Sequence, residues 1–369
     1  ALERAFEFAA RDVRYVALDV GLGIGAGYRA ASPASDCEKR YGDCKDKAFL
    51  MRALASPWGL ETYPVLVRTR ELGPLQRSAP SPGQFNHCIA AVKLPEGVGE
   101  DLWTTLEVEG IGRVVFLDAT ARESSPWCLP WGDQGTTALL VHPGGGKLVT
   151  LPVQPPRAGS TLRELDVEVD EQGALLRANL VETWTGTSAA RMRNYYSGLS
   201  DEQHRATVLE NLQHRFPSTT VADYGIEGLD AVCTPVVESK TLEGGRLGKR
   251  VGDLLILEPG QTGYGLLRGT PPKPPRQWPY ILGRPRREEL RVTLRIPAGW
   301  TPEELPEAAQ VESPFLSAQA DWSVEDGQLT YRREMSILAV EVPVEDYPAF
   351  REALLRARAA DRQAIVLVQ

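Results

Sequence analysis

Residues Tyr41 to Ala48 read YGDCKDKA, and this stretch decides the fold of the N-terminal part of the chain. Asp43 is a favourable N-cap residue, and Asp46 follows it at the spacing of a capping box. The pattern predicts a helix over residues 43–55, with Cys44 in its first turn. The thiol of Cys44 would then lie beside the unpaired backbone N–H groups of the helix start.

Cys44 is therefore a candidate nucleophile. The positive end of the helix dipole favours a thiolate at this position, and Lys45 and Lys47 add positive charge nearby. A partly buried Cys that only fills space is an equally open interpretation of this segment. A nucleophilic Cys needs a base, and the base usually needs an acceptor that orients it, so the other members of such a site should lie on adjoining strands.

His87 and Asp118 are the candidates for these two roles. Of the four histidines, His87 lies inside a predicted strand of the N-terminal part, residues 85–94, and Asp118 ends another apolar strand, residues 112–118. Taken singly, His87 could be a hydrogen-bonded core residue and Asp118 a turn cap. In chain order, however, a Cys at a helix start followed by a His and an Asp on strands matches the arrangement of thiol proteases.

The motifs around these residues resemble a known family. GDCKDKA, PSPGQFNHCI and FLDAT, together with RYVALDVG and GYR, closely resemble the transglutaminase-like superfamily, which has a papain-like core. The bacterial branch, in which this core lies between β-rich domains, is the closer match. The resemblance covers residues 1–150 and implies Cys44 as nucleophile, His87 as general base and acid, and Asp118 as the group that orients His87. It also hints at an exported or periplasmic protein.

The chain departs from that branch at its N-terminus, and the motifs leave the oxyanion hole open. The β domain that usually precedes the core is absent, and the chain opens at Ala1 without Met, so we expect a fragment or a processed product. The motifs do not fix the oxyanion hole, for which the backbone N–H of Cys44 is one natural donor. The weaker candidates for substrate or oxyanion contact are Tyr15, Tyr28, Gln84, Trp127 and Trp131.

The patterning predicts an α+β fold in two domains. The resemblance implies that residues 1–155 are the papain-like, transglutaminase-like core, in which we expect the helix that bears Cys44 to pack on an antiparallel sheet. The Pro- and Gly-rich stretch from Pro152 to Ser160 is the expected linker. Residues 156–369 form a β-rich α+β accessory domain. Its expected elements are a hairpin of strands 162–169 and 175–184, helices near 187–196 and 201–216, a long loop over 259–287 and a closing helix over 346–367.

Composition excludes several classes of protein. The 369 residues exceed one typical domain of about 150. The net charge of −8, with scattered Lys and Arg, argues against a nucleic-acid partner. No apolar run approaches the roughly 18 residues of a membrane span. The five cysteines are too few, and odd in number, for a dense disulfide framework.

The sequence also argues against a metal or nucleotide site. No close Cys-x-x-Cys pair is present, and His87 and Cys88 should point to opposite faces of their strand, so zinc binding is disfavoured. Gly21-x-Gly23-x-x-Ala26 follows a strand, but we expect Pro33 to interrupt the helix that a dinucleotide site requires. We therefore predict no metal and no cofactor.

The leading functional prediction is thiol-dependent acyl transfer on amide bonds of a peptide or protein substrate by Cys44, His87 and Asp118. Hydrolysis, as in a cysteine peptidase, is favoured because water is the default acceptor, and transfer to an amine, as in a transglutaminase, is the variant. A catalytically idle transglutaminase-like binding or assembly module is the competing class, since one fold hosts many functions.

Overall fold

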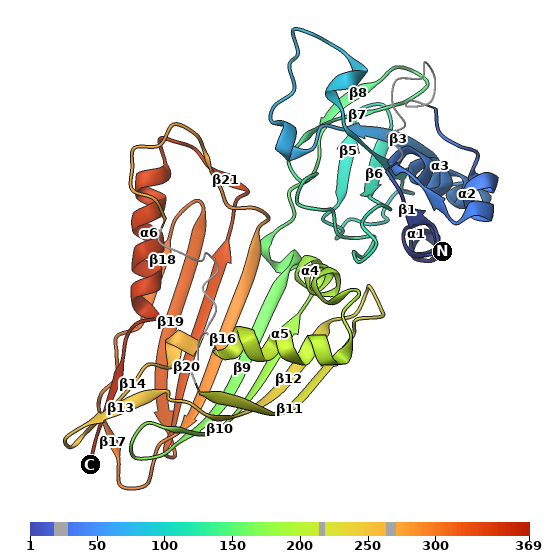
Figure 1. The fold of residues 1–369 in the computed structure, drawn as a ribbon. Coiled ribbons are helices and arrows are strands. Elements are labelled where there is room, and N and C mark those ends of the chain that lie inside the picture. Colours follow the sequence, from blue (N-terminus) through green and yellow to red (C-terminus); the bar gives the residue numbers. More distant parts are fainter. Residues whose placement is uncertain (18–28, 214–217, 263–270) are drawn as a thin grey trace. The chain divides into compact units, whose positions relative to one another are not determined.

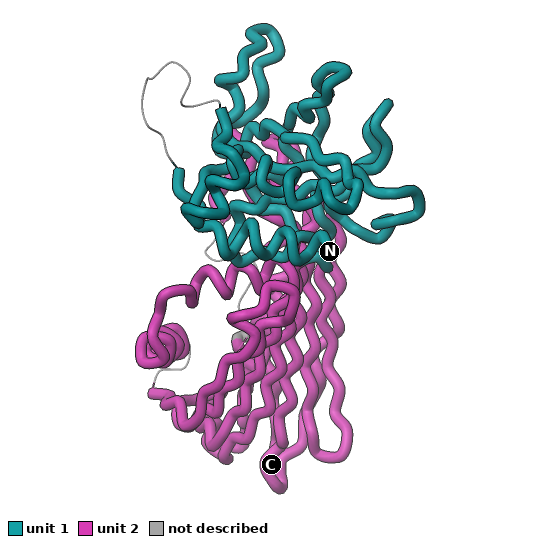
Figure 2. Tube along the Cα trace, turned by 90° about the vertical axis from the view of Figure 1, so that its right-hand side faces the viewer, with its two compact units in different colours: residues 1–158 teal, residues 159–369 magenta. Residues whose placement is uncertain are grey.

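The computed structural model describes residues 1–17, 29–213, 218–262 and 271–369. These residues form a mixed α+β structure with many strands and few helices (Figure 1). They divide into two compact units, residues 1–158 and 159–369 (Figure 2). No helix of the described part of the chain is long and apolar enough to span a membrane.

The described residues of unit 1 form three α-helices and a six-stranded antiparallel sheet. The helices are α1 (Leu2–Glu7), which continues as a π-helix over Phe8–Asp12, α2 (Pro33–Lys39) and α3 (Cys44–Ala55). The sheet has the order β5-β6-β4-β3-β7-β8. Its strands are β3 (Thr62–Val67), β4 (His87–Lys93), β5 (Thr105–Val108), β6 (Gly112–Leu117), β7 (Thr137–Leu140) and β8 (Lys147–Thr150). A short parallel pair, β1 (Arg14–Tyr15) and β2 (Tyr41–Gly42), lies outside this sheet.

Helix α3 packs on one face of this sheet, against β3 and β4. Leu50 and Met51 of the helix form one buried cluster with Ala90 and Val92 of β4 and with residues of α1. The alternate residues of the same strands form a second cluster on the other face of the sheet. Both faces are therefore covered, which explains why β4 reads as an almost continuous apolar run.

The helix predicted from the capping box is confirmed, but α2 was missed. Pro33 was expected to interrupt a helix, and instead it occupies the first turn of one, where its missing N–H costs nothing. Ser32 is the N-cap, and its side chain accepts a hydrogen bond from the backbone N–H of Ser35. The glycine-rich segment that precedes this helix in the sequence lies outside the described residues.

Unit 2 is dominated by an eight-stranded sheet of order β11-β12-β10-β9-β16-β20-β19-β18. Every neighbouring pair is antiparallel except β9 and β16. The strands are β9 (Ser160–Val169), β10 (Leu175–Trp184), β11 (Thr219–Glu227), β12 (Val236–Gly244), β16 (Arg286–Arg295), β18 (Ala309–Glu312), β19 (Leu316–Glu325) and β20 (Gln328–Ile337). The predicted hairpin of β9 and β10 is confirmed.

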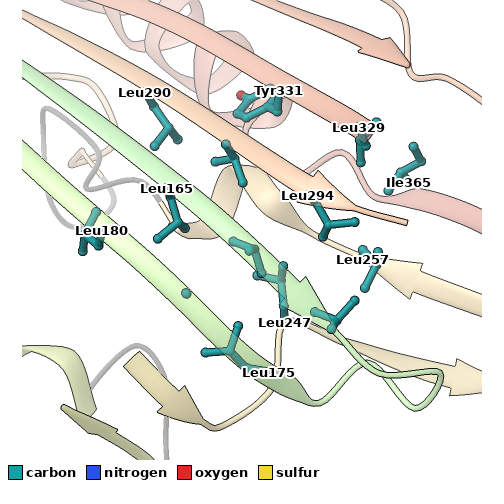
Figure 3. Close-up of a cluster of buried hydrophobic side chains, with 14 of the residues drawn as sticks. Leu165, Leu175, Leu180, Leu247, Leu257, Leu290, Leu294, Leu329, Tyr331 and Ile365 are labelled. Atoms are coloured by element: carbon teal, nitrogen blue, oxygen red, sulfur yellow. The ribbon is translucent and has the colours of Figure 1, made fainter. Parts of the chain in front are cut away.

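A smaller sheet of order β13-β14-β22-β17 covers part of the large one. Its strands are β13 (Gly248–Val251), β14 (Leu254–Leu257), β17 (Thr301–Glu304) and β22 (Ile365–Val368). Figure 3 shows the buried leucines, such as Leu165 and Leu294 of the large sheet, that gather with Leu257 and Ile365 of the small one. A two-stranded ribbon joins β15 (Tyr280–Ile281) and β21 (Glu341–Val342).

Three helices complete unit 2, namely α4 (Gly186–Tyr196), α5 (Asp201–Gln213) and α6 (Tyr347–Ala360). Helix α4 packs on β9, β10 and β12, and α6 packs on β18 and β19 (Figure 1). The prediction of a closing helix to residue 367 was wrong at its end. The run Ile365–Val368 is rich in β-branched residues and pairs with β14 and β17 as strand β22 instead.

The segment expected to be a linker is only partly exposed. Gln154 is 2 % exposed, and its side chain carbonyl accepts hydrogen bonds from Leu129 N and from the Gln134 side chain, so residues up to 154 pack on unit 1. Gly159, whose carbonyl accepts from Arg287 N, already belongs to unit 2. Short 3₁₀ turns lie at residues 56–58, 70–72, 82–84, 156–158 and 259–262.

Candidate functional site

Cys44 is the first residue of α3, and a capping box fixes the helix start beside it. The Asp43 carboxylate accepts from Asp46 N at 3.2 Å, and the Asp46 carboxylate accepts from Asp43 N at 3.0 Å. Gly42 permits this approach, since a Cβ there would lie 2.9 Å from the Asp46 Cβ. The half-buried Cys44 thiol is thus held at the positive end of the helix.

His87 and Asp118 come from adjacent strands and form a direct pair. His87 is the first residue of β4 and Asp118 follows the last residue of β6. The His87 Nε2 lies 3.1 Å from Asp118 Oδ2, and their side chains are 14 % and 3 % exposed. The other oxygen, Oδ1, accepts from the backbone N–H of Thr120 at 2.9 Å and from its hydroxyl at 2.7 Å. Asp118 therefore caps a turn and also holds a histidine.

The pair is an ion pair at neutral pH. Burial disfavours the imidazolium, but the charge of Asp118 and hydrogen bonds with Asp118 and Cys44 outweigh it and raise the pKa of His87 to about 11. Burial likewise opposes ionisation of Asp118, but His87 and the Thr120 bonds keep its pKa below the ordinary value. Cys44 lies near enough to His87 to contribute to this rise in pKa, so the three predicted residues lie close to one another.

Asp133 adds a second carboxyl group that the sequence analysis missed. It is 2 % exposed, and burial followed by the charge of Asp118 raises its pKa to about 8. Asp133 therefore keeps its proton at neutral pH, and its buried Oδ2 has no hydrogen-bond partner among the described residues. The available signal was an Asp in the loop before β7, but such residues are usually turn caps.

The same three side chains could also hold a metal ion. Ligand atoms of His87, Asp118 and Asp133 all lie within 4.8 Å of one another, and this is the sole such group found among the described residues. One imidazole and two carboxylates are ligands that zinc accepts. The expectation of no metal site therefore stays a prediction for experiment.

Lys47 has a different role from the one expected of it. It is 1 % exposed, and its Nζ donates to the carbonyls of Ala9 at 2.8 Å, Ala10 at 3.3 Å and Ala119 at 3.1 Å. Burial lowers its pKa to about 8, against the attraction of Asp118. Lys47 thus ties the helix that bears Cys44 to the residue after Asp118, and it packs inside the unit rather than flanking the thiol.

Tyr15 is the weak candidate that the structure brings near the thiol. It pairs with Gly42 in the β1–β2 ribbon, two residues before Cys44. Burial, followed by the charges of Cys44 and Asp43, raises the pKa of Tyr15, so its hydroxyl stays protonated and able to donate. Tyr28 lies outside the described residues.

Two other weak candidates have their polar groups bonded elsewhere. The Gln84 side-chain amide donates to the carbonyls of Gln76 and Ala79, so it ties its own loop together. The Trp127 indole N–H donates to Glu3 at 2.9 Å and its ring packs on the α1 side of the core. Their N–H groups are therefore engaged within unit 1, and contact of either side chain with substrate stays a prediction. Trp131 is 45 % exposed, two residues before Asp133.

The remaining thiols of unit 1 differ from Cys44 in their surroundings. Cys88 is 5 % exposed, and burial, with a smaller contribution from Cys44, raises its pKa to about 12, which leaves it unreactive. Cys37 is half-buried on α2 and packs against the core. Cys37 therefore matches Cys44 in exposure but lacks the histidine.

The C-terminal part of the chain matches a known domain family. Residues 259–367, less than a third of the chain, match a family described as a domain of unknown function with a solved structure, DUF3858. No curated protein shows significant sequence similarity to the chain. One similar solved structure is that of a candidate protease from Parabacteroides distasonis, with 8 % identity and a TM-score of 0.49. The match covers 99 % of this chain but 50 % of that protein, and we draw no functional conclusion from it.

Proposed function

We propose that unit 1 is a papain-like, transglutaminase-like core that transfers acyl groups from amide bonds to the thiol of Cys44. The observation that carries the proposal is the His87–Asp118 pair, with 3.1 Å between His87 Nε2 and Asp118 Oδ2, together with a Cys44 near enough to raise the pKa of His87. The packing of α3 on an antiparallel sheet supports it, since a rigid helix start holds the nucleophile and two neighbouring strands hold the base and its partner.

In the proposed reaction, the Cys44 thiolate attacks the carbonyl carbon of the amide. Because Asp118 occupies Nε2 of His87, the other ring nitrogen, Nδ1, is left for proton transfer at the thiol. The tetrahedral intermediate collapses as the C–N bond breaks, and His87 gives its proton to the leaving amine. Water then attacks the thioester while His87 takes up a proton, and the acid product leaves with Cys44 regenerated.

The negative oxygen of the intermediate needs hydrogen-bond donors. We assign one donor to the backbone N–H of Cys44, which lies in the first turn of α3. The Tyr15 hydroxyl is the second donor in this proposal, because Tyr15 stays protonated and its electrostatic interaction with Cys44 places it near the thiol. Water is the proposed acceptor of the acyl group, and transfer to an amine is the variant.

The proposal is tested by alkylating the full chain with iodoacetamide and mapping the modified cysteines by mass spectrometry. Cys44 should react at least ten times faster than Cys37, and His87→Ala should remove most of that difference, since the imidazolium stabilises the thiolate. Equal labelling of Cys44 and Cys37 would contradict the proposal.

Turnover is measured separately with fluorescent casein, with and without an added primary amine. Cys44→Ala should abolish product formation, whereas Cys37→Ala, the matched variant of similar exposure, should retain it. Release of peptides indicates hydrolysis, and amine incorporation indicates transfer. A reactive Cys44 without either product would favour the catalytically idle binding module.

A further inference from the structure

Unit 2 contains a cavity of about 610 Å³. All of its lining residues belong to unit 2, whereas Cys44, His87 and Asp118 belong to unit 1. Its lining comes from neighbouring strands β9, β10, β12 and β16 and from helices α4 and α5. This volume is in the range of pockets that hold small organic ligands and is many times that of a single water molecule. The inference below concerns this cavity and is independent of the proposed acyl transfer.

Buried charged residues form the floor of the cavity, and they are paired with one another. The Glu182 carboxylate accepts from Arg163 Nε at 2.8 Å and from Lys240 Nζ at 2.6 Å. Lys240 also pairs with Glu238 at 2.5 Å, and Glu238 accepts from the Tyr196 hydroxyl at 2.8 Å. We call Arg163, Glu182, Glu238 and Lys240 the charged row. Each is at most 5 % exposed, so the floor is fixed before any ligand arrives.

Four further arginines line the cavity, and one of them, Arg287, pairs with Glu289 and Glu334. Arg284 donates to the Thr187 hydroxyl at 3.0 Å, and Arg286 donates to the carbonyls of Leu282 and Arg284, both at 3.1 Å. Arg191 is exposed on α4. Burial lowers the pKa of Arg286, the charge of Glu288 opposes this, and the charge of Arg191 adds to it, so the guanidinium groups of Arg191 and Arg286 lie near enough to repel each other.

The balance of charge around the cavity is positive. Among the described lining residues, the cations are Arg163, Arg191, Lys240, Arg284, Arg286 and Arg287, and the anions are Glu182, Glu238 and Glu288. Without Arg287, which pairs with Glu289 and Glu334, five cations and three anions leave an excess of two positive charges in a chain whose net charge is −8. Because like charges held together are unfavourable, an anion in the cavity would relieve the repulsion.

We propose that this cavity binds a small organic anion, with its carboxylate or phosphate groups against Arg191, Arg284 and Arg286. Guanidinium groups recognise both kinds of anion through paired hydrogen bonds. The side chains of Trp184 and Tyr195, which also line the cavity, provide apolar surface for the organic part of the ligand.

Binding is tested by isothermal titration calorimetry of the full chain at constant ionic strength. Citrate is the carboxylate probe, glucose 6-phosphate is the phosphate probe, and glucose is the uncharged control. At least one anion should bind with a Kd below about 1 mM, and glucose should not bind. Citrate binding alone identifies carboxylates as the ligand class, and glucose 6-phosphate binding alone identifies phosphates. If neither anion binds with a Kd below about 1 mM, the proposal is overturned.

Charge-reversal variants then locate the site. Arg191→Glu should weaken anion binding at least tenfold, and the exposed position of Arg191 allows the variant to fold. Arg356→Glu is the matched control, because it makes the same change of charge at an exposed position of α6 that does not line the cavity. An equal loss in both variants would mean that the anion responds only to overall charge, and the proposal would be wrong.

Discussion

Replacing Asp118 by asparagine tests the ion pair on which the proposed site depends. The Asn side chain keeps an oxygen for the two Thr120 bonds but removes the charge that faces His87. The pKa of His87, about 11 in the native chain, should then fall toward its ordinary value of about 6.5, because burial disfavours the imidazolium and only the smaller contributions of Cys44 and Asp133 still raise the pKa. The loss of one hydrogen bond between ionised partners should cost about 1.5–3 kcal/mol of unfolding free energy at pH 6.

The pH dependence of this loss follows from the sign of the shift. Because folded His87 binds its proton more tightly than the unfolded chain does, the stability from the pair is complete below about pH 6.5. It declines as pH rises toward about 11, the pKa of the folded state. The difference in stability between native and Asp118→Asn protein should therefore narrow steadily from pH 7 to pH 11.

The titration of His87 can be followed by NMR of the histidine side chains, because the chain contains four histidines. The His87 signal of the native protein should stay constant from pH 5.5 to 9, and that of Asp118→Asn should titrate within this range. Asp101→Asn, which removes an exposed acid of unit 1, should leave the His87 signal unchanged. A native His87 that titrates near its ordinary pKa of about 6.5 would refute the buried ion pair.

Three further predictions concern the surroundings of the pair. The pKa of Asp133 is raised to about 8, so its carboxyl group should favour the unfolded state increasingly as pH rises from about 4 to 8. Asp133→Asn should therefore raise the melting temperature more at pH 8 than at pH 5. An equal rise at both pH values would contradict this prediction. Lys47→Met leaves three carbonyls without their donor and should cost about 3–5 kcal/mol in urea unfolding, against less than about 1 kcal/mol for the exposed Lys93→Met. EDTA should change neither alkylation of Cys44 nor turnover, and a loss reversed by zinc would instead support a metal at the His87 cluster.

Local patterns predicted the elements of unit 1 that carry the proposed site. The capping box fixed the start of α3 because its two carboxylates act within one turn, and the apolar runs located β4 and β6. Neither pattern depends on distant residues. The closing helix of unit 2 failed beyond Ala360 because its last residues pair with strands far away in the sequence.

Long-range partners explain what the sequence analysis missed. Lys47 reads as an exposed lysine, and its burial depends on carbonyls of Ala9 and Ala119 at distant positions in the chain. Asp133 reads as a loop residue until the loop folds beside Asp118. The period of β9 places Arg163 on the buried face with Leu165, but a buried charge makes sense only when Glu182 of the next strand is known.

The charged row in unit 2 also has a consequence for how the large sheet assembles. Arg163 lies directly opposite Glu182 in the pairing of β9 with β10. A slip of two residues between β9 and β10 would keep every side chain on its own face of the sheet. It would place Glu182 opposite Leu165 in one direction and opposite Thr161 in the other, so Glu182 would lose Arg163 as its partner in either case. Such an isolated buried charge costs about 3–5 kcal/mol, whereas leucines at these positions would tolerate the slip. The row therefore selects one alignment of long, otherwise similar strands as the chain folds.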